Sequence, residues 1–481
     1  MSTIDSLLAA LDQALVVTAS GKVRIKNETQ LRAKIDLLAT KSALGLPPEQ
    51  EAARWLIWET ALALGIVPAS IQGLYAARGR GETPVNFSVP AINLRALSYD
   101  CARAVFRAAN ALEVGALIFE IARSEIGYTA QRPAEYSASV LAAAIKEGYR
   151  GPVFIQGDHF QIGHKKYAAN PEAEVGAVRD LIAEAIAAGF YNIDIDTSTL
   201  VDLSKPTIPE QQALNTRLCA ELTAYIRQLQ PKGITISVGG EIGEVGGKNS
   251  TEAELRAFLD GYRADLLAQP TPPRTPRGSL TGISKISIQT GTSHGGVVLP
   301  DGSIATVAVD FDTLKHLSGV ARRDYGLAGA VQHGASTLPE NAFSKFPECE
   351  TCEVHLATGF QNTFYDKLPE TLRAEIYDWL KTNAAEERKP NDTDEQFFYR
   401  SRKKAIGPFK DKAWNLPDTD RQAIGAAWEK QFRFLFEQLN VVYTRALVEK
   451  HTEPVLVHKK LADLHLGAKE KEAEDVSGLA D

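Results

Sequence analysis

From Val85 onward the chain alternates short apolar runs with longer amphipathic segments, and this alternation constrains the fold most. Eight runs have the pattern of strands: Asn86–Asn93, Ala116–Arg123, Pro152–His159, Asn192–Ser198, Thr235–Gly243, Ser284–Thr292, Ala328–Gly334 and Cys352–Gly359. Helix-like segments follow most of them: Ala96–Leu112, Ala134–Glu147, Pro171–Ala188, Pro209–Leu229, Thr251–Leu267 and Pro339–Phe346. This α/β order predicts a (β/α)8 TIM barrel over residues 85–365. An open doubly wound sheet would alternate in the same way, but polar residues follow many of these strands rather than gathering at one crevice.

The regions on either side of the predicted barrel have helical periodicity. Residues 1–84 are expected to form an N-terminal helical extension, and residues 366–467 a C-terminal one. The helices expected there span Ser6–Val16, Glu28–Ala43, Pro48–Leu64, Leu368–Asn383 and Arg421–Lys450. The charged tail, 468–481, is predicted to be disordered.

Composition excludes several classes of protein. The net charge is −7, and no stripe dense in Lys and Arg is present, which argues against a nucleic-acid partner. No apolar run approaches the roughly 20 residues that cross a bilayer, and no secretory signal opens the chain, so a cytoplasmic location is expected. Four cysteines are too few for a disulfide framework, and the single Cys349-x-x-Cys352 pair has no second pair with which to form a zinc ribbon.

Polar residues end most of the predicted strands, and the carboxyl ends of barrel strands converge on one site. These residues are Asn93, Asp158, His159, Asp196, Glu241, His294, His333 and His355. His159 follows a run of buried type, Val153–Ile155, and His294 and His333 are each followed directly by glycine. Three imidazoles with an open coordination position predict a metal site, for zinc or alternatively cobalt or manganese.

The glycines beside two of these histidines predict an anion site. In His294-Gly295-Gly296 and His333-Gly334-Ala335-Ser336, glycine lets backbone N–H groups approach a phosphate closely. A metal beside a phosphate nest suits a substrate whose carbonyl binds the metal while its phosphate is held. Such a metal acidifies the neighbouring C–H bond and stabilises an enediolate.

Four motifs resemble the class II, metal-dependent ketose-bisphosphate aldolases. They are Gly157-Asp158-His159, Gly240–Gly243 with Gly246-Gly247, Ser293-His294-Gly295 and Val331–Ser336. The resemblance covers roughly Asn86 to Asn440. It implies an aldol lyase that reversibly cleaves a ketose 1,6-bisphosphate, by default fructose 1,6-bisphosphate, with tagatose 1,6-bisphosphate open. It also implies a homo-oligomeric enzyme of carbohydrate metabolism, with a place in glycolysis.

The resemblance implies a role for each matching residue. His159, His294 and His333 would bind zinc, Asp158 would exchange a proton with the substrate hydroxyl, and Glu241 would support or join the metal ligands. The residues that would bind substrate are Asn93 at the floor of the site and, around the phosphate with a monovalent cation, Gly295, Gly334, Ser336 and Thr358.

The chain departs from the family pattern in three places. Lys248-Asn249 follows the double glycine where the family has an acidic loop that supplies the base, so Glu244 or Glu252 is a hypothetical substitute. At the end of the eighth strand His355 replaces the usual Asn, and the second strand ends in an unusually charged segment at Glu120.

Two other functions stay open. One is a non-catalytic aldolase-like subunit, and another is a metal-dependent sugar-phosphate isomerase or epimerase. A Schiff-base aldolase is disfavoured, because Lys285 lies near the beginning of its strand.

Overall fold

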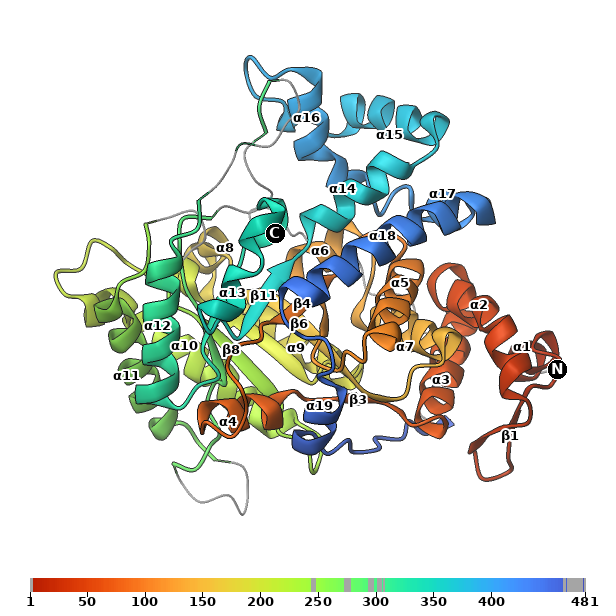
Figure 1. Cartoon of the computed structure of the whole chain (residues 1–481), viewed down its shortest axis with the longest axis horizontal. Coiled ribbons are helices and arrows are strands. Elements are labelled where there is room, and N and C mark those ends of the chain that lie inside the picture. Colours follow the sequence, from red (N-terminus) through yellow and green to blue (C-terminus); the bar gives the residue numbers. More distant parts are fainter. Residues whose placement is uncertain are drawn as a thin grey trace.

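The computed structural model of the chain describes residues 3–243, 248–271, 278–292, 298–300, 305, 308–461, 464 and 479. Within them a parallel barrel forms the centre of the molecule (Figure 1). Its strands are β4 (Val89–Asn93), β5 (Ile118–Ala122), β6 (Gly151–Gln161), β7 (Asn192–Asp196), β8 (Ser237–Glu241), β9 (Lys285–Ser287), β10 (Ala330–Gln332) and β11 (Glu353–Leu356). β11 pairs with β4, and β6 pairs with both β5 and β7, so the eight strands close on themselves. The predicted TIM barrel is confirmed.

Helices surround the barrel. Those between its strands or directly after them are α5 (Ser98–Ala111), α6 (Arg123–Tyr128), α7 (Pro133–Glu147), α8 (His164–Ala169), α9 (Pro171–Ala187), α10 (Ile208–Leu229), α11 (Glu252–Ala268), α12 (Phe311–Tyr325), α13 (Lys345–Glu348) and α14 (Thr358–Lys367). No helix was predicted over α12. Its sequence does contain helix-ending signals, because Asp310 caps the first turn and Gly326, with φ 72°, ends the helix. The helix expected over Pro339–Phe346 is wrong, because one short 3-10 turn, η3 (Glu340–Ala342), and the start of α13 occupy this segment.

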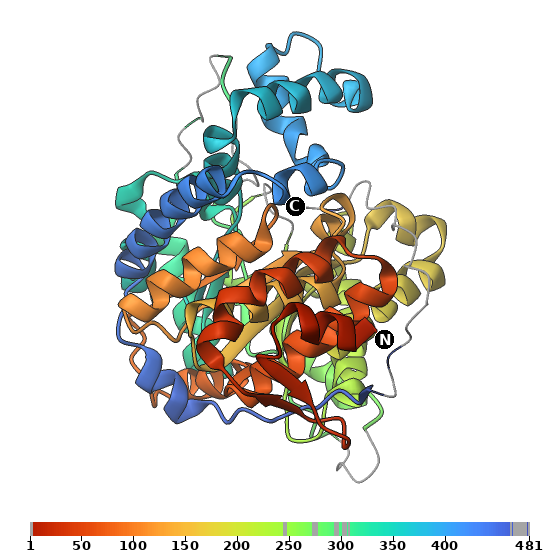
Figure 2. The same ribbon diagram turned by 90° about the vertical axis from the view of Figure 1, so that its right-hand side faces the viewer.

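The N-terminal segment contains strands as well as helices, and Figure 2 shows it packed on one side of the barrel. Its elements are α1 (Thr3–Ala10), β1 (Leu15–Val17), β2 (Val23–Ile25), α2 (Glu28–Leu44), α3 (Pro47–Ala63), β3 (Ile66–Ala69) and α4 (Gln72–Gly79). The helix expected to end at Val16 stops at Ala10, because β1 and β2 form an antiparallel hairpin. β3 pairs in parallel with the first half of β6, outside the closed barrel.

The C-terminal segment leaves the barrel, returns to it and ends against α3. Its elements are α15 (Glu370–Asn383), η4 (Ala385–Glu387), α16 (Asp394–Ser401), η5 (Arg402–Ala405), α17 (Lys410–Trp414), α18 (Asp418–Gln438) and α19 (Arg445–His451). α18 packs on α5 and α14, and the helix expected over Arg421–Lys450 is divided between α18 and α19. The indole N–H of Trp58 donates to the carbonyl of Val457 at 2.8 Å, which fastens the final segment to α3. The predicted tail lies outside the described residues, except for Leu479.

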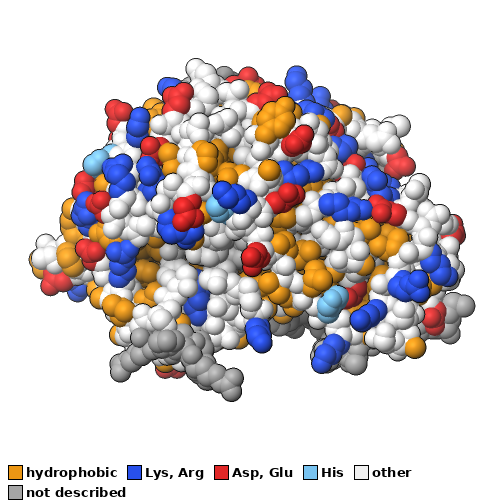
Figure 3. Space-filling view, turned by 60° about the horizontal axis from the view of Figure 1, so that its bottom comes forward, with side chains coloured by type: hydrophobic (Ala, Val, Ile, Leu, Met, Phe, Trp, Pro, Cys, Tyr) orange, Lys and Arg blue, Asp and Glu red, His pale blue; other side chains and the backbone are white. Residues whose placement is uncertain are grey.

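The surface is mixed in character. On the face that Figure 3 presents, Lys and Arg side chains lie among Asp, Glu and hydrophobic side chains rather than in a stripe of one sign. Among the described residues, no helix has both the length and the apolar character needed to cross a bilayer. The four cysteines are buried and form no disulfide.

Candidate active site

A bulge in β6 turns two consecutive side chains into the barrel. Gly157 pairs with Ile193 and Phe160 with Ile195, so β6 advances three residues while β7 advances two. His159, in the extra turn of chain, has φ 37°, a left-handed conformation that costs a non-glycine residue about 1–2 kcal/mol. Asp158 and His159 are both buried, although neighbouring side chains in a regular strand point to opposite faces. The strain is therefore stored where the chemistry is concentrated.

His159 meets His333 and Glu241, which come from the ends of two other strands. The ring centroids of His159 and His333 are 4.4 Å apart, and Glu241 Oε1 lies 2.8 Å from His159 Nδ1 and 3.8 Å from His333 Nε2. The ligand atoms of the three residues lie within 4.8 Å of one another, and all three are buried. Asp196 Oδ2, 3.2 Å from His159 Nδ1, helps to orient the imidazole. This group has the donor types and spacing of a divalent-metal site.

A second cluster surrounds His355. Its Nδ1 lies 3.0 Å from Glu120 and 3.2 Å from Asp158, and its Nε2 lies 2.8 Å from Glu353. Asp158, His333 and His355 also have ligand atoms within 4.8 Å of one another, as do Glu120, Glu353 and His355. In His355 both ring nitrogens are engaged by carboxylates, whereas Glu241 directs one oxygen toward both His159 and His333. The group around Glu241 is therefore the better candidate for the metal.

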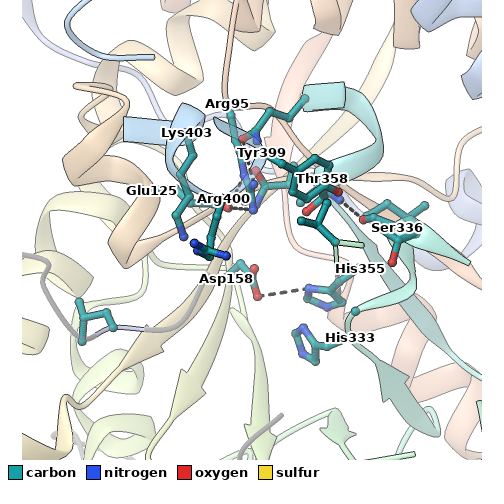
Figure 4. Close-up of a pocket in the computed structure, with 18 of the residues that line it drawn as sticks. Arg95, Glu125, Asp158, His333, Ser336, His355, Thr358, Tyr399, Arg400 and Lys403 are labelled. Atoms are coloured by element: carbon teal, nitrogen blue, oxygen red, sulfur yellow. Dashed lines mark hydrogen bonds and ion pairs between the residues drawn. The ribbon is translucent and has the colours of Figure 1, made fainter. Parts of the chain in front are cut away.

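A cavity of about 600 Å³ opens above these residues at the carboxyl end of the barrel. His333, His355, Asp158 and Glu120 line it on the barrel side. Figure 4 shows Ser336 and Thr358 on one side of this opening, with Lys403 and Arg400 on the other.

One wall of the cavity has the form of a phosphate cradle. Gly334 has φ 68°, which lets the chain turn sharply from β10 into the 3-10 turn η2 (Ala335–Thr337). The backbone N–H of Ala357 donates to Ser336 Oγ at 2.6 Å, so η2 is tied to the start of α14. Thr358, the first residue of α14, lines the cavity beside Gly334 and Ser336. A helix N-terminus next to a glycine turn presents N–H donors to an anion.

The carboxylates favour positive charge on the imidazoles. Burial alone would lower the pKa of His159, but the nearby charges of Asp158 and Glu241 outweigh it and raise the pKa well above its usual value. Burial and the nearby negative charge of Asp196 raise the pKa of Glu241 to about 7. Burial and the nearby negative charge of Asp158 raise the pKa of Glu120 to about 8. A bound cation would relieve the repulsion among these acids.

The sequence matches a known family over most of its length. The model of fructose-bisphosphate aldolase class-II matches residues 83–408. The chain belongs to this family. Its members are lyases that are generally metal-dependent, in agreement with the donor group at the strand ends. No curated protein is detectably similar in sequence.

Solved structures resemble this class II aldolase family member at low sequence identity. A probable tagatose 6 phosphate kinase from Sinorhizobium meliloti 1021 has 15% identity and a TM-score of 0.52, with 76% of this chain and 99% of that chain covered. Fructose-bisphosphate aldolase from Campylobacter jejuni has 16% identity and a TM-score of 0.48, with 79% and 97% covered. At these identities the likeness concerns the fold alone.

Most of the site residues expected for the aldolase family lie together. Asn93, Asp158, His333, Gly334, Ser336 and Thr358 line the cavity, and His159 and Glu241 lie beside His333. The amide of Asn93 donates to a carboxylate oxygen of Glu125 at 2.5 Å, and both residues line the cavity. His294, Gly295 and the hypothetical base Glu244 lie outside the described residues.

The loop after β8 supplies no acid to the cavity from its described part. Lys248 pairs with Glu254 at 2.7 Å. Glu252, the other hypothetical base, pairs with Arg256 and His316 at the exposed start of α11 and does not line the cavity.

Lys285 is part of a buried ionic network beneath the site. Its Nζ donates to Gln156 at 2.8 Å and to Asp194 at 2.9 Å, and it also pairs with Glu353. Burial would lower the pKa of Lys285, but Asp194 and Glu353 raise it above its usual value. A lysine that is held protonated and does not line the cavity cannot be the nucleophile of a Schiff-base aldolase.

The sequence analysis assigned no function to several residues that line the cavity. The barrel contributes Glu120, Glu125, Arg95 and Gln361, and the C-terminal segment contributes Lys389, Asp392, Gln396, Tyr399, Arg400 and Lys403. The charged end of the second predicted strand was a signal for Glu120. The residues from Lys389 to Lys403 gave no such signal, because only the return of the chain over the barrel brings them to the site.

Proposed function

We propose that this protein is a metal-dependent aldol lyase that reversibly cleaves a ketose 1,6-bisphosphate, by default fructose 1,6-bisphosphate, to dihydroxyacetone phosphate and an aldehyde phosphate. One observation carries the proposal. His159, His333 and Glu241 have ligand atoms within 4.8 Å of one another beside Asp158, under a cavity whose wall has a glycine turn and a helix N-terminus. A carbonyl and a neighbouring phosphate can be bound together in such a site.

The donor set suits a divalent cation. Two imidazoles and a carboxylate, all buried, are a common ligand set of catalytic zinc, and cobalt or manganese can use the same atoms. We propose that His159, His333 and Glu241 hold the metal, with His294 as a further ligand expected from the sequence. When bound, the ion would polarise the substrate carbonyl and so acidify the adjacent C–H bond.

Two buried carboxyl groups are proposed to move protons. Asp158 lines the cavity 3.2 Å from His355 and is proposed to take the proton of the substrate hydroxyl as the carbon–carbon bond breaks. In the reverse direction it returns this proton. Glu120 lines the same cavity and accepts a hydrogen bond from the Gln156 amide at 3.1 Å. It is proposed to take the role of the missing loop acid at the three-carbon fragment. Glu125 is less suited, because Arg95, Asn93 and a backbone N–H already engage it.

The phosphate of the three-carbon fragment is proposed to bind Gly334, Ser336 and Thr358, with Gly295 as a further contact and a monovalent cation as partner. N–H groups at the start of α14 and the Thr358 hydroxyl can donate to its oxygens. We further propose that the enzyme acts in the cytoplasm and that it forms a homo-oligomer. Size-exclusion chromatography with light scattering would test the oligomeric state.

A matched pair of histidine variants tests this function. His333→Gln removes a proposed metal ligand. The control, His316→Gln, changes an exposed histidine of α12 that pairs with Glu252 of α11. We expect His333→Gln to lose bound metal and to cleave fructose 1,6-bisphosphate roughly 100-fold more slowly or worse, with His316→Gln near wild type. If wild type holds the metal and cleaves no ketose bisphosphate, the aldolase proposal is wrong and a non-catalytic aldolase-like subunit becomes the better reading.

A further inference from the structure

Helix α4 of the N-terminal segment covers the amino end of the barrel, opposite the cavity (Figure 1). Arg78 of α4 donates to the carbonyl of Ala328 at 2.9 Å and to that of Phe87 at 2.8 Å, and these residues lie just before β10 and β4. Tyr75, one turn earlier on α4, is 1% exposed. Its hydroxyl donates to Glu353, the first residue of β11. The N-terminal segment therefore places a side chain in the interior of the barrel.

Glu353 is held through both of its carboxylate oxygens. Tyr75 donates to Oε2, whereas Lys285 and Gln156 donate to Oε1, the latter at 2.9 Å. His355 Nε2 lies 2.8 Å from the same Oε1. The last torsion of a glutamate side chain has a broad, shallow preference, so a hydrogen bond to one oxygen fixes the direction of the other. The Tyr75 hydroxyl therefore fixes the plane of the carboxylate that meets the imidazole.

His355 carries this orientation to the cavity. Its Nε2 is held by Glu353, and its Nδ1 lies 3.2 Å from Asp158 and 3.0 Å from Glu120. Figure 4 shows the imidazole directed toward Asp158, with a dashed line between the two side chains. Asp158 and Glu120 are the carboxyl groups proposed above to move protons. A rotation of the Glu353 carboxylate would turn the imidazole, and the two carboxyl groups would lose their common partner.

We propose that Tyr75 is a positioning residue of the active site, which acts through Glu353 and His355 on Asp158. This inference rests on the proposed function for the role of Asp158. Tyr75 precedes residue 83, where the match to the family model begins, so the contribution comes from the N-terminal segment of this chain. Catalysis depends steeply on the placement of the reacting groups, and a small displacement that starts far from the chemistry slows the chemical step.

A hydroxyl that is buried for stability alone would affect folding and not turnover, and Tyr99 offers a matched control for this case. Tyr99 is also 1% exposed, and its hydroxyl also donates to a carboxylate, that of Asp36, at 2.7 Å. It does not line the cavity. Tyr75→Phe and Tyr99→Phe each remove one such hydroxyl and leave the ring in place. A loss of stability is expected in both variants, whereas a loss of turnover is expected in one.

The first measurement is the coupled assay of fructose 1,6-bisphosphate cleavage. We expect Tyr75→Phe to lower kcat about 10-fold or more and to change KM less than about 2-fold, with the metal bound per chain unchanged. Tyr99→Phe should keep kcat within about 2-fold of wild type. In the His355→Asn background, Tyr75→Phe should change kcat less than about 2-fold, because the path to Asp158 is already broken.

Equal kcat values in Tyr75→Phe and Tyr99→Phe, or a 10-fold loss that persists in the His355→Asn background, would overturn the inference. Circular dichroism checks that each variant is folded. If Tyr75→Phe does not fold, Glu353→Gln takes its place, because it keeps the shape of the side chain that links Tyr75 to the imidazole. It should show the same loss of kcat and the same small effect in the His355→Asn background.

A second measurement does not depend on turnover. In protein with isotope-labelled histidine, the ring resonances of His355 are those that disappear in His355→Asn. Tyr75→Phe should shift these resonances and Tyr99→Phe should not; resonances that stay in place in Tyr75→Phe would overturn the inference. If they shift and wild type cleaves no ketose bisphosphate, the link from Tyr75 to His355 stands and the lyase proposal fails. If wild type cleaves fructose 1,6-bisphosphate and Tyr75→Phe changes neither kcat nor the resonances, the positioning role is wrong and the lyase proposal stands.

Discussion

Replacing Lys285 by methionine would remove the cation that faces Asp194 and Glu353 inside the barrel. The Lys285 side chain is 1% exposed, and those of Asp194 and Glu353 are 5% and 0% exposed. Methionine is similar in size, so packing should change little while two buried carboxylates lose their counter-charge. Breaking a buried ion pair from one side costs about 3–5 kcal/mol, and we expect a loss of unfolding free energy in this range near pH 7.5.

The cost should shrink in acid. Burial raises the pKa of Asp194 to about 6. Burial also acts to raise the pKa of Glu353, but Lys285 and His355 outweigh it and lower this pKa to about 2. Without Lys285 both values rise, and a carboxyl whose folded-state pKa lies above its unfolded-state value destabilises the fold only at the higher pH, where it must ionise. At pH 5 the penalty should therefore fall to about 1–2 kcal/mol, the loss of hydrogen bonds.

Urea unfolding at pH 7.5 and pH 5, followed by circular dichroism, measures both values. The control is Lys205→Met, which removes an exposed lysine 3.7 Å from Asp202 and should cost about 0.5 kcal/mol or less. If Lys285→Met costs no more than this control, or costs the same at the two pH values, the reasoning about an ionic network is refuted.

Two further predictions concern the site. Gly157→Ala should lower the free energy of unfolding in urea by roughly 1–3 kcal/mol and reduce the metal bound per chain, because the new Cβ would lie 2.4 Å from the Phe160 ring. An unchanged unfolding free energy and metal content would contradict the bulge argument. Gly334→Ala should raise the KM for fructose 1,6-bisphosphate several-fold and cost about 1 kcal/mol, because φ is 68°; an unchanged KM would count against the cradle.

Sequence reasoning located the barrel because strand and helix periods differ and parallel strands are buried on both faces. All eight barrel strands lie within or close to their expected ranges, and the polar residues at their ends do converge. Asp158, His159 and His333 were found in this way. The convergence follows from chain direction alone, so it needs no knowledge of side-chain packing.

Other features depend on tertiary structure and could not be predicted. The β6 bulge has the sequence of a regular strand, in which Asp158 and His159 would face opposite sides. His355 and Glu353 lie two residues apart on β11 and therefore share a face, but their ion pairs with β5, β6 and β9 depend on register around the barrel. Lys403 falls between the two helices expected in the C-terminal extension, and nothing local in the sequence indicates that the chain folds back over the site.

The most direct test of the account is a coupled assay of fructose 1,6-bisphosphate cleavage before chelation, after chelation and after zinc is restored. We predict cleavage that disappears with the chelator and returns with zinc, because His159, His333 and Glu241 are proposed to hold the ion. Cleavage that persists in metal-free protein would contradict the metal-dependent mechanism. No cleavage by protein that holds one metal per chain would contradict the assignment of this substrate.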